Sequence, residues 1–204
     1  KSLYENLRIA SKFISKQRQD EKVGKPVDRD EWHMTPQTVN AYYNPTTNEI
    51  CFPAGILQYP FFDPEADDAF NYGAIGVVIG HEMTHGFDDQ GCHFDKNGNM
   101  TEWWTKEDTE NFAKLGEYYA DFFSKIEVLP GLNANGKMTL GENIADHGGL
   151  MVAYQAFKNA EAEAMKVNKK VAMANAGKKL GLTADQRFFC AYSGVWGQNI
   201  TEKE

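Results

Sequence analysis

Residues 81–85 read His-Glu-Met-Thr-His, and this pentapeptide constrains the chain more than any other feature. On an α-helix, residues four apart share one face, with Cβ atoms about 5–6 Å apart, so His81 and His85 can bind one metal ion together. A catalytic zinc site uses three protein ligands and keeps a further position open. The motif therefore predicts a helix, a bound metal ion, a third ligand elsewhere, and Glu82 beside the open position.

The stretch before the motif, residues 72–80, is apolar on all sides, which is typical of a buried helix. It contains Gly73, Gly76 and Gly80, and each glycine disfavours a helix by about 1 kcal/mol relative to alanine. We therefore expect a helix over residues 68–88 with another element packed close to its backbone. The alternative, a surface helix that carries two histidines by chance, does not explain the apolar run.

A second predicted helix, residues 141–165, begins with Glu142 and Asp146 on one face. Glu142 can be the third ligand, and Asp146 can accept a hydrogen bond from the outer nitrogen of a ligand histidine. Asp88 or Asp89 could orient the other histidine, and the sequence does not choose between them. The alternative is that these acids only lie at helix ends, where the helix dipole favours negative charge at an N-terminus.

Four runs of sequence resemble the neprilysin and endothelin-converting-enzyme family of zinc metallopeptidases, peptidase family M13. They are residues 39–57, 73–91, 140–149 and 181–199. The resemblance implies an α+β fold, mainly α with a small β-sheet. It implies a thermolysin-like gluzincin core, in which one helix carries the HExxH motif and a second helix carries the remaining ligand.

The resemblance also implies roles for particular residues. It assigns one zinc ion per chain to three ligands: His81, His85 and Glu142. It makes Glu82 the general base that takes a proton from a zinc-bound water, and it makes Asp146 the partner of a zinc-bound histidine. Asn40 and Ala41 are implied to hold the substrate backbone.

Outside the site, hydrophobic spacing predicts helices over residues 2–19 and 183–200 and a helix starting near Thr105. The helix starting near Thr105 has an apolar stripe that we expect to be core: Phe112, Leu115, Tyr119, Phe122 and Ile126. The last helix of the chain is expected to bury four aromatic residues: Phe188, Phe189, Tyr192 and Trp196. Strands over 38–43 and 49–53 are predicted to form a hairpin.

The chain of 204 residues predicts one domain, 1–204, with an N-terminal helix and linker over 1–31 and a core over 32–204. Its net charge of −8 argues against nucleic acid as a partner. No apolar run approaches the roughly 20 residues of a transmembrane helix. Members of the family are several times longer, so we expect the rest of the peptidase chain, a helical N-terminal domain and a C-terminal segment, to be missing.

Three cysteines, an odd number without C-x-x-C spacing, predict free structural thiols: Cys51, Cys92 and Cys190. This pattern differs from the disulfide-rich animal members of the family and favours a bacterial member. An extracytoplasmic location is then expected, in the periplasm, in the cell envelope or secreted, with the cytoplasm as the alternative.

The sequence predicts a zinc-dependent endopeptidase that hydrolyses small peptides. Family members favour cleavage before a hydrophobic residue, which the resemblance implies for this chain. The alternative is a zinc-stabilised module that binds peptides or partners without catalysis. A turnover assay with and without a chelator separates the two.

Overall fold

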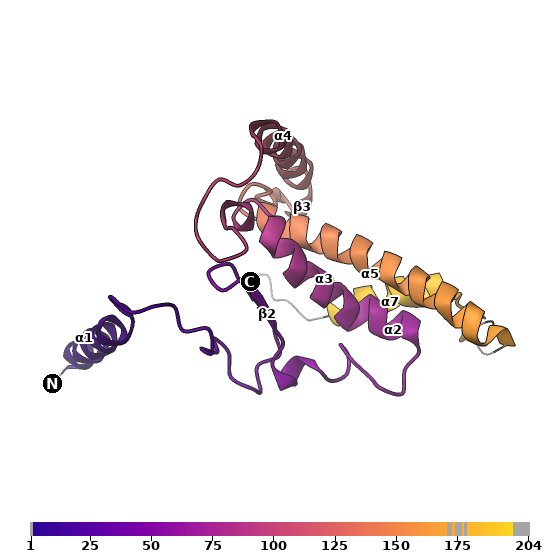
Figure 1. Ribbon diagram of the computed structural model, residues 1–204, viewed down its shortest axis with the longest axis horizontal. Coiled ribbons are helices and arrows are strands. Elements are labelled where there is room, and N and C mark those ends of the chain that lie inside the picture. The colour runs from indigo at the N-terminus through magenta and orange to yellow at the C-terminus, as the bar shows by residue number, and fades with distance from the viewer. Residues whose placement is uncertain (1, 171–172, 174–176, 178, 198–204) are drawn as a thin grey trace. The chain divides into compact units, whose positions relative to one another are not determined.

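The computed structural model describes the following parts of the chain: residues 2–170, 173, 177 and 179–197 (Figure 1). The chain forms two compact units, residues 1–33 and 34–204. The first unit contains α1, Leu3–Lys22, which is capped by Ser2 and confirms the helix expected over 2–19. No residue of α1 is buried. No described helix has both the length and the apolar composition needed to cross a bilayer.

The second unit begins with a short antiparallel hairpin. Strand β1, Tyr42–Asn44, pairs with β2, Glu49–Cys51, which confirms the predicted hairpin. The strand β1 begins later than expected. The segment before it lies instead against the 3-10 turn η1, Ala54–Ile56, where the Gly55 amide donates to the Pro36 carbonyl at 2.8 Å.

A second hairpin and three long helices follow the metal-binding motif. The sequence did not predict this hairpin, which consists of β3, Glu127–Leu129, and β4, Leu132–Asn133. The helices are α4, Lys106–Phe123, α5, Leu140–Val167, and α7, Ala184–Val195. The chain is thus mainly helical with two small antiparallel sheets, so the expected fold class is confirmed.

One continuous helical segment carries the HExxH motif and changes its winding three times. It comprises α2, Asp68–Asn71, the π turn η2, Tyr72–Gly76, α3, Val77–Thr84, and the 3-10 turn η3, His85–Phe87. A further 3-10 turn, η4, Gly91–His93, follows in the next loop. The helix expected over 68–88 is confirmed, but the sequence did not predict the π turn. Such turns often lie at functional sites; here the Ile75 amide donates outside the helix, to the Phe61 carbonyl at 2.9 Å.

Two of the three glycines in residues 72–80 lie where another backbone approaches closely. A Cβ on Gly80 would lie 2.8 Å from Cα of Gly149 in α5. A Cβ on Gly73 would lie 2.2 Å from the carbonyl oxygen of Phe188 in α7. The helices α3 and α5 therefore cross in close contact, side by side (Figure 1). Gly76 has no such neighbour closer than 3.4 Å, so the expectation is wrong for that glycine.

The apolar stripe of α4 is largely exposed. The exposed fraction is 64% for Leu115, 55% for Phe122 and 42% for Ile126, so the prediction that the stripe is core is wrong for these three residues. Within the described part of the unit, no other element covers these side chains. Phe112 and Tyr119 are half-buried. The helix α4 contacts α5 through a hydrogen bond between Tyr119 and His147. His147 does not line the cavity that contains the candidate metal ligands.

The main core of the second unit lies between α2, α3, α5 and α7. Its buried members are Ala69, Val77, Ala153, Phe157, Ala184 and Phe188. A capping box of Thr183 and Gln186 starts α7, so the helix begins where it was predicted. Phe188 is fully buried, whereas Phe189 and Trp196 are about half exposed, because a helix at the edge of a unit buries only one face. Residues 198–200 of the predicted helix lie outside the described residues.

An ion pair links α7 to the residue that caps α2. Arg187 in α7 donates to Asp67 at 2.8 Å, and Asp67 also caps α2 through the Phe70 amide.

All three cysteines are free, as expected, although Cys190 is exposed.

Candidate metal centre

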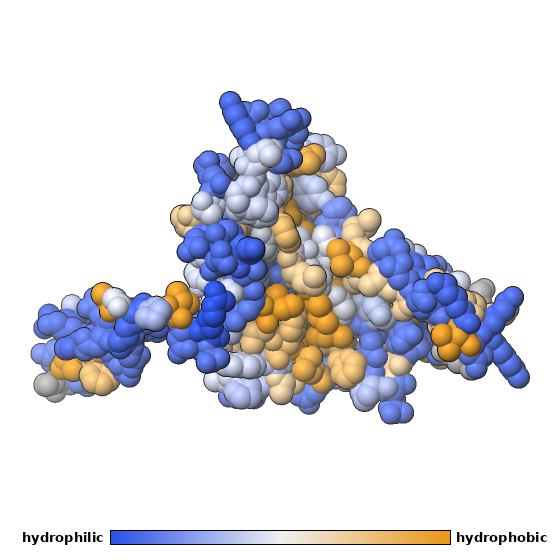
Figure 2. All heavy atoms as spheres, in the orientation of Figure 1, coloured by the Kyte–Doolittle hydropathy of each residue, from blue (hydrophilic) through white to orange (hydrophobic). Residues whose placement is uncertain are grey.

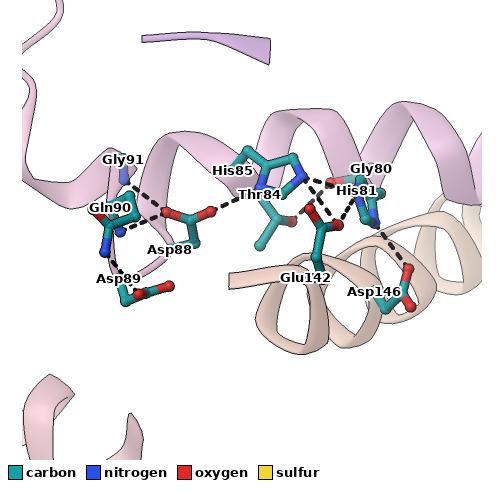
Figure 3. Close-up of polar contacts among 10 residues, drawn as sticks. All are labelled: Gly80, His81, Thr84, His85, Asp88, Asp89, Gln90, Gly91, Glu142 and Asp146. Carbon is teal, nitrogen blue, oxygen red and sulfur yellow. Dashed lines mark hydrogen bonds and ion pairs between the residues drawn. The ribbon is translucent and has the colours of Figure 1, made fainter. Parts of the chain in front are cut away.

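His81 and His85 lie on consecutive turns of the helical segment and turn their Nε2 atoms toward each other. These two atoms are 2.9 Å apart, and the ring centroids are 4.5 Å apart with the rings edge to face. Glu142, in the first turn of α5, places Oε2 3.3 Å from Nε2 of His81 and 3.7 Å from Nε2 of His85 (Figure 3). One ligand atom from each of the three residues lies within 4.8 Å of the others. The structure thus brings together the three residues predicted as metal ligands.

The outer nitrogen of each histidine faces an aspartate. Nδ1 of His81 lies 2.8 Å from Asp146, and Nδ1 of His85 lies 2.7 Å from Asp88 (Figure 3). An ionised carboxylate only accepts hydrogen bonds, so each ring carries its proton on Nδ1 and leaves the Nε2 lone pair free. This arrangement prepares both imidazoles to bind a cation.

Asp88, and not Asp89, is the partner of His85. Asp88 is buried, and its second oxygen accepts the amides of Gln90 at 2.8 Å and Gly91 at 2.6 Å. Asp89 accepts only the side-chain amide of Gln90, at 2.9 Å, through Oδ2. Its other oxygen, Oδ1, is buried without a hydrogen-bond partner in the described structure.

Burial and charge shift the pKa values of the neighbouring groups. Burial raises the pKa of Asp88, but hydrogen bonds from His85 and from two backbone amides outweigh it, so the net pKa is lowered. Burial lowers the pKa of His85, but the Asp88 hydrogen bond and the charge of Glu142 raise it above its ordinary value. The site therefore carries fixed negative charge around two basic nitrogens, which suits a cation.

Glu82 lies beside the two histidines and Glu142, and it is only 6% exposed. Its burial raises the pKa of its carboxyl, and the two neighbouring histidines offset only part of this shift. A carboxylate that is hard to keep ionised is a stronger base at neutral pH.

A cavity of about 530 Å³ connects these residues. Its walls include the three predicted ligands and Glu82, and also the two residues predicted to hold substrate, Asn40 and Ala41. The sequence did not predict its apolar wall, which includes Val39, Phe61, Val78, Tyr192, Val195 and Trp196. All of them except Phe61 lie within the four runs that resemble the family, which is the only signal that could have found them. On the face in Figure 2, apolar residues gather between the positions of β2 and α2 in Figure 1.

Two imidazoles from one helical segment and a carboxylate from a second helix, with an aspartate behind each imidazole, form a candidate single-metal centre with the ligand arrangement of the gluzincin type. The sequence profile of Peptidase family M13 matches residues 40–204. The chain belongs to this family.

Individual relatives agree with this assignment. The chain is 46% identical to Neprilysin-3 of Drosophila melanogaster over 182 residues, which is 89% of this chain and 22% of that protein. It is 48% identical to human Endothelin-converting enzyme 1 over 172 residues, 84% of this chain and 21% of that protein. The zinc metalloprotease Zmp1 of Mycobacterium tuberculosis, solved with an inhibitor, superposes with a TM-score of 0.79 and 46% identity, over 90% of this chain and 27% of that one. The chain thus spans about a fifth of the length of the curated relatives it matches.

Proposed function

We propose that this chain carries the catalytic centre of a zinc-dependent endopeptidase that hydrolyses small peptides. The observation that carries this proposal is the placement of Glu82. A buried carboxylate with a raised pKa lies beside three candidate ligands and lines the same cavity as the predicted substrate-holding residues. A site that only held a structural metal would have no use for a base there.

The donor set suits zinc. Zinc accepts neutral imidazole nitrogen and carboxylate oxygen, and catalytic sites commonly have three such protein ligands. The short distance between the two Nε2 atoms, and the aspartates that hold both Nδ1 protons, support His81, His85 and Glu142 as the ligands of one zinc ion. When bound, zinc supplies a Lewis acid that polarises a carbonyl and lowers the pKa of water.

Glu82 is proposed as the general base. Its carboxylate would take a proton from the attacking water and pass it to the leaving amine. Asp146 and Asp88 would each hold one histidine in the tautomer that keeps Nε2 free.

The substrate would bind as an extended peptide. In the described structure, β1 and β2 form a two-stranded sheet, and main-chain hydrogen bonds along a sheet edge can hold an added strand. Asn40 and Ala41 precede β1 and line the cavity, which supports their role in holding the substrate backbone. The apolar wall would accept a hydrophobic side chain next to the scissile bond.

The test is hydrolysis of an unstructured fluorogenic peptide, measured with and without a chelator. Glu82→Gln should retain zinc and lose at least about a hundredfold in turnover, because general bases contribute about 10²–10⁴-fold. His81→Ala should lose the metal. Comparable turnover by the Gln variant would remove Glu82 as the base, and zinc binding without turnover by the unaltered chain would favour the non-catalytic module.

A further inference from the structure

The carboxylate of Glu142 is held by few contacts of its own. Its side chain is 68% exposed, and its only ion pairs within the described part of the chain are those with His81 and His85. A flexible, exposed side chain gains little fixed geometry from such contacts. The position of this candidate ligand therefore depends on where the backbone of the first turn of α5 lies.

That first turn has no side-chain cap. The Thr139 side chain makes no capping hydrogen bond, and the amides of Leu140, Gly141 and Glu142 find no acceptor within the described residues. These free amides form the positive end of the helix dipole. A nearby negative charge would stabilise this end of the helix.

Asp89 supplies such a charge. Its partnerless, buried oxygen Oδ1 lies against Gly141, since a Cβ at that glycine would be 2.9 Å from Oδ1. The same Cβ would be 3.1 Å from Oδ2 of Asp88. A glycine at this position is what allows the carboxylates to approach the helix backbone.

The two adjacent aspartates therefore differ in what they touch. Asp88 is occupied by His85 and by two backbone amides, whereas Asp89 has one oxygen directed at the start of α5. We infer that Asp89 is a positioning residue for the third metal ligand: its carboxylate, of which Oδ1 is buried, holds the first turn of α5 and so sets where Glu142 lies. This inference rests on the ligand set of the proposed function.

The contact between Asp89 and α5 complements the crossing of α3 and α5. Gly149 fixes α5 against the backbone of His81, about two turns after Glu142. Asp89 fixes the end of the helix that carries the ligand. The two contacts together restrain the first turn and the middle of α5 relative to the histidines.

The test is a double-mutant cycle on zinc affinity, measured by competition with a chromophoric chelator. Asp89→Asn keeps the shape and removes the charge, so it should weaken zinc binding about 5- to 30-fold, as expected for a partly buried charge at a helix N-terminus. In a Glu142→Ala background the same change should alter affinity less than about twofold. Asp88→Asn is the matched control, and its effect should persist in both backgrounds because it acts through His85.

A spectroscopic readout accompanies the cycle. The visible absorption spectrum of the Co²⁺-loaded Asp89→Asn chain should shift toward that of Glu142→Ala, which a general loss of stability would not produce. Gly141→Ala, which places a methyl group 2.9 Å from Oδ1 of Asp89 and 3.1 Å from Oδ2 of Asp88, is a second variant, and it should weaken zinc binding in both backgrounds but more where Glu142 is present. Circular dichroism of the metal-free variants reports whether they are folded.

Equal losses from Asp89→Asn in the two backgrounds would overturn the inference, as would no loss in either. Zinc binding without peptide turnover would overturn the peptidase proposal and leave the inference standing. A chain that binds no zinc would overturn both.

Discussion

The crossing of α3 and α5 and the outer face of α4 are both helix surfaces of the second unit. Hydrophobicity predicts that large apolar side chains lie where helices pack, and each surface departs from this in its own way. At the crossing, glycines replace large side chains and the two backbones nearly touch. On α4, large apolar side chains are present but exposed. Apolar periodicity therefore predicts that a helix forms, whereas small residues in an apolar run indicate where it packs most closely.

This difference matters for the metal centre. The ligand histidines and the ligand glutamate come from different helices, so the site depends on the spacing of those helices to within fractions of an ångström. Close backbone contact fixes that spacing better than flexible side chains do. The exposed face of α4 carries no such requirement.

The largest effect is expected from a methyl group added at the crossing. A Cβ on Gly149 would lie 2.5 Å from the backbone nitrogen of His81, so Gly149→Ala must push the helices apart. We expect the free energy of unfolding to fall by about 3 kcal/mol, at the upper end of overpacking effects, and zinc affinity to fall with it. Urea unfolding and a zinc titration measure both effects. A normally stable variant with unchanged affinity would show that the crossing is loose.

The second prediction concerns how zinc affinity at the metal centre depends on pH. Zinc needs deprotonated imidazoles, and the raised pKa of His85 means that protons compete from a higher pH than at an ordinary histidine. As the pH falls from 7 to 5.5, zinc affinity should fall by about ten- to a hundredfold. Asp88→Asn removes the hydrogen bond that raises this pKa, so its affinity profile should move to lower pH. A profile that is flat over this range would exclude histidine ligands.

A smaller effect is expected from the same substitution at Gly76. Gly76 lies in the same run as Gly80, but its nearest neighbour to an added Cβ is 3.4 Å away. Gly76→Ala should therefore be tolerated and raise the free energy of unfolding by up to about 1 kcal/mol, because alanine loses less entropy on folding. A loss comparable to that of Gly149→Ala would mean that the π turn itself requires glycine.

The smallest effect is expected on α4. Leu115→Gln and Phe122→Gln remove apolar groups that are already more than half exposed, so unfolding free energies should change by no more than about 0.5 kcal/mol. Phe188→Ala, at a fully buried aromatic, is the contrast and should cost about 3–5 kcal/mol. Large losses from the α4 variants would mean that this face is covered in the protein in solution.

Much of the site could be predicted because the motif spacing has one physical meaning. Two histidines four apart share a helix face, and so do Glu142 and Asp146, whatever the remainder of the fold does. The choice between Asp88 and Asp89 could not be made, because the α-helix ends at Thr84 and the chain continues as a 3-10 turn. Helical spacing cannot be extrapolated across that change.

The parts of the fold that the sequence missed depend on contacts between distant segments. The π turn at residues 72–76 does not alter the apolar pattern of the sequence, so that pattern could not reveal it. The turn is accompanied by a hydrogen bond from the Ile75 amide to the distant Phe61 carbonyl. The apolar wall of the cavity joins Val39 to Val195 and Trp196, which only the folded chain brings together. A single sequence carries no direct signal of such proximity.

The most direct test of the central claim is a calorimetric titration of zinc into the metal-free chain. If His81, His85 and Glu142 converge on one ion, the titration should show one zinc ion per chain, substitution of either histidine by alanine should abolish binding, and Glu142→Ala should weaken it. A chain that binds no zinc, or one whose alanine variants bind it as tightly as the unaltered protein, would contradict the account.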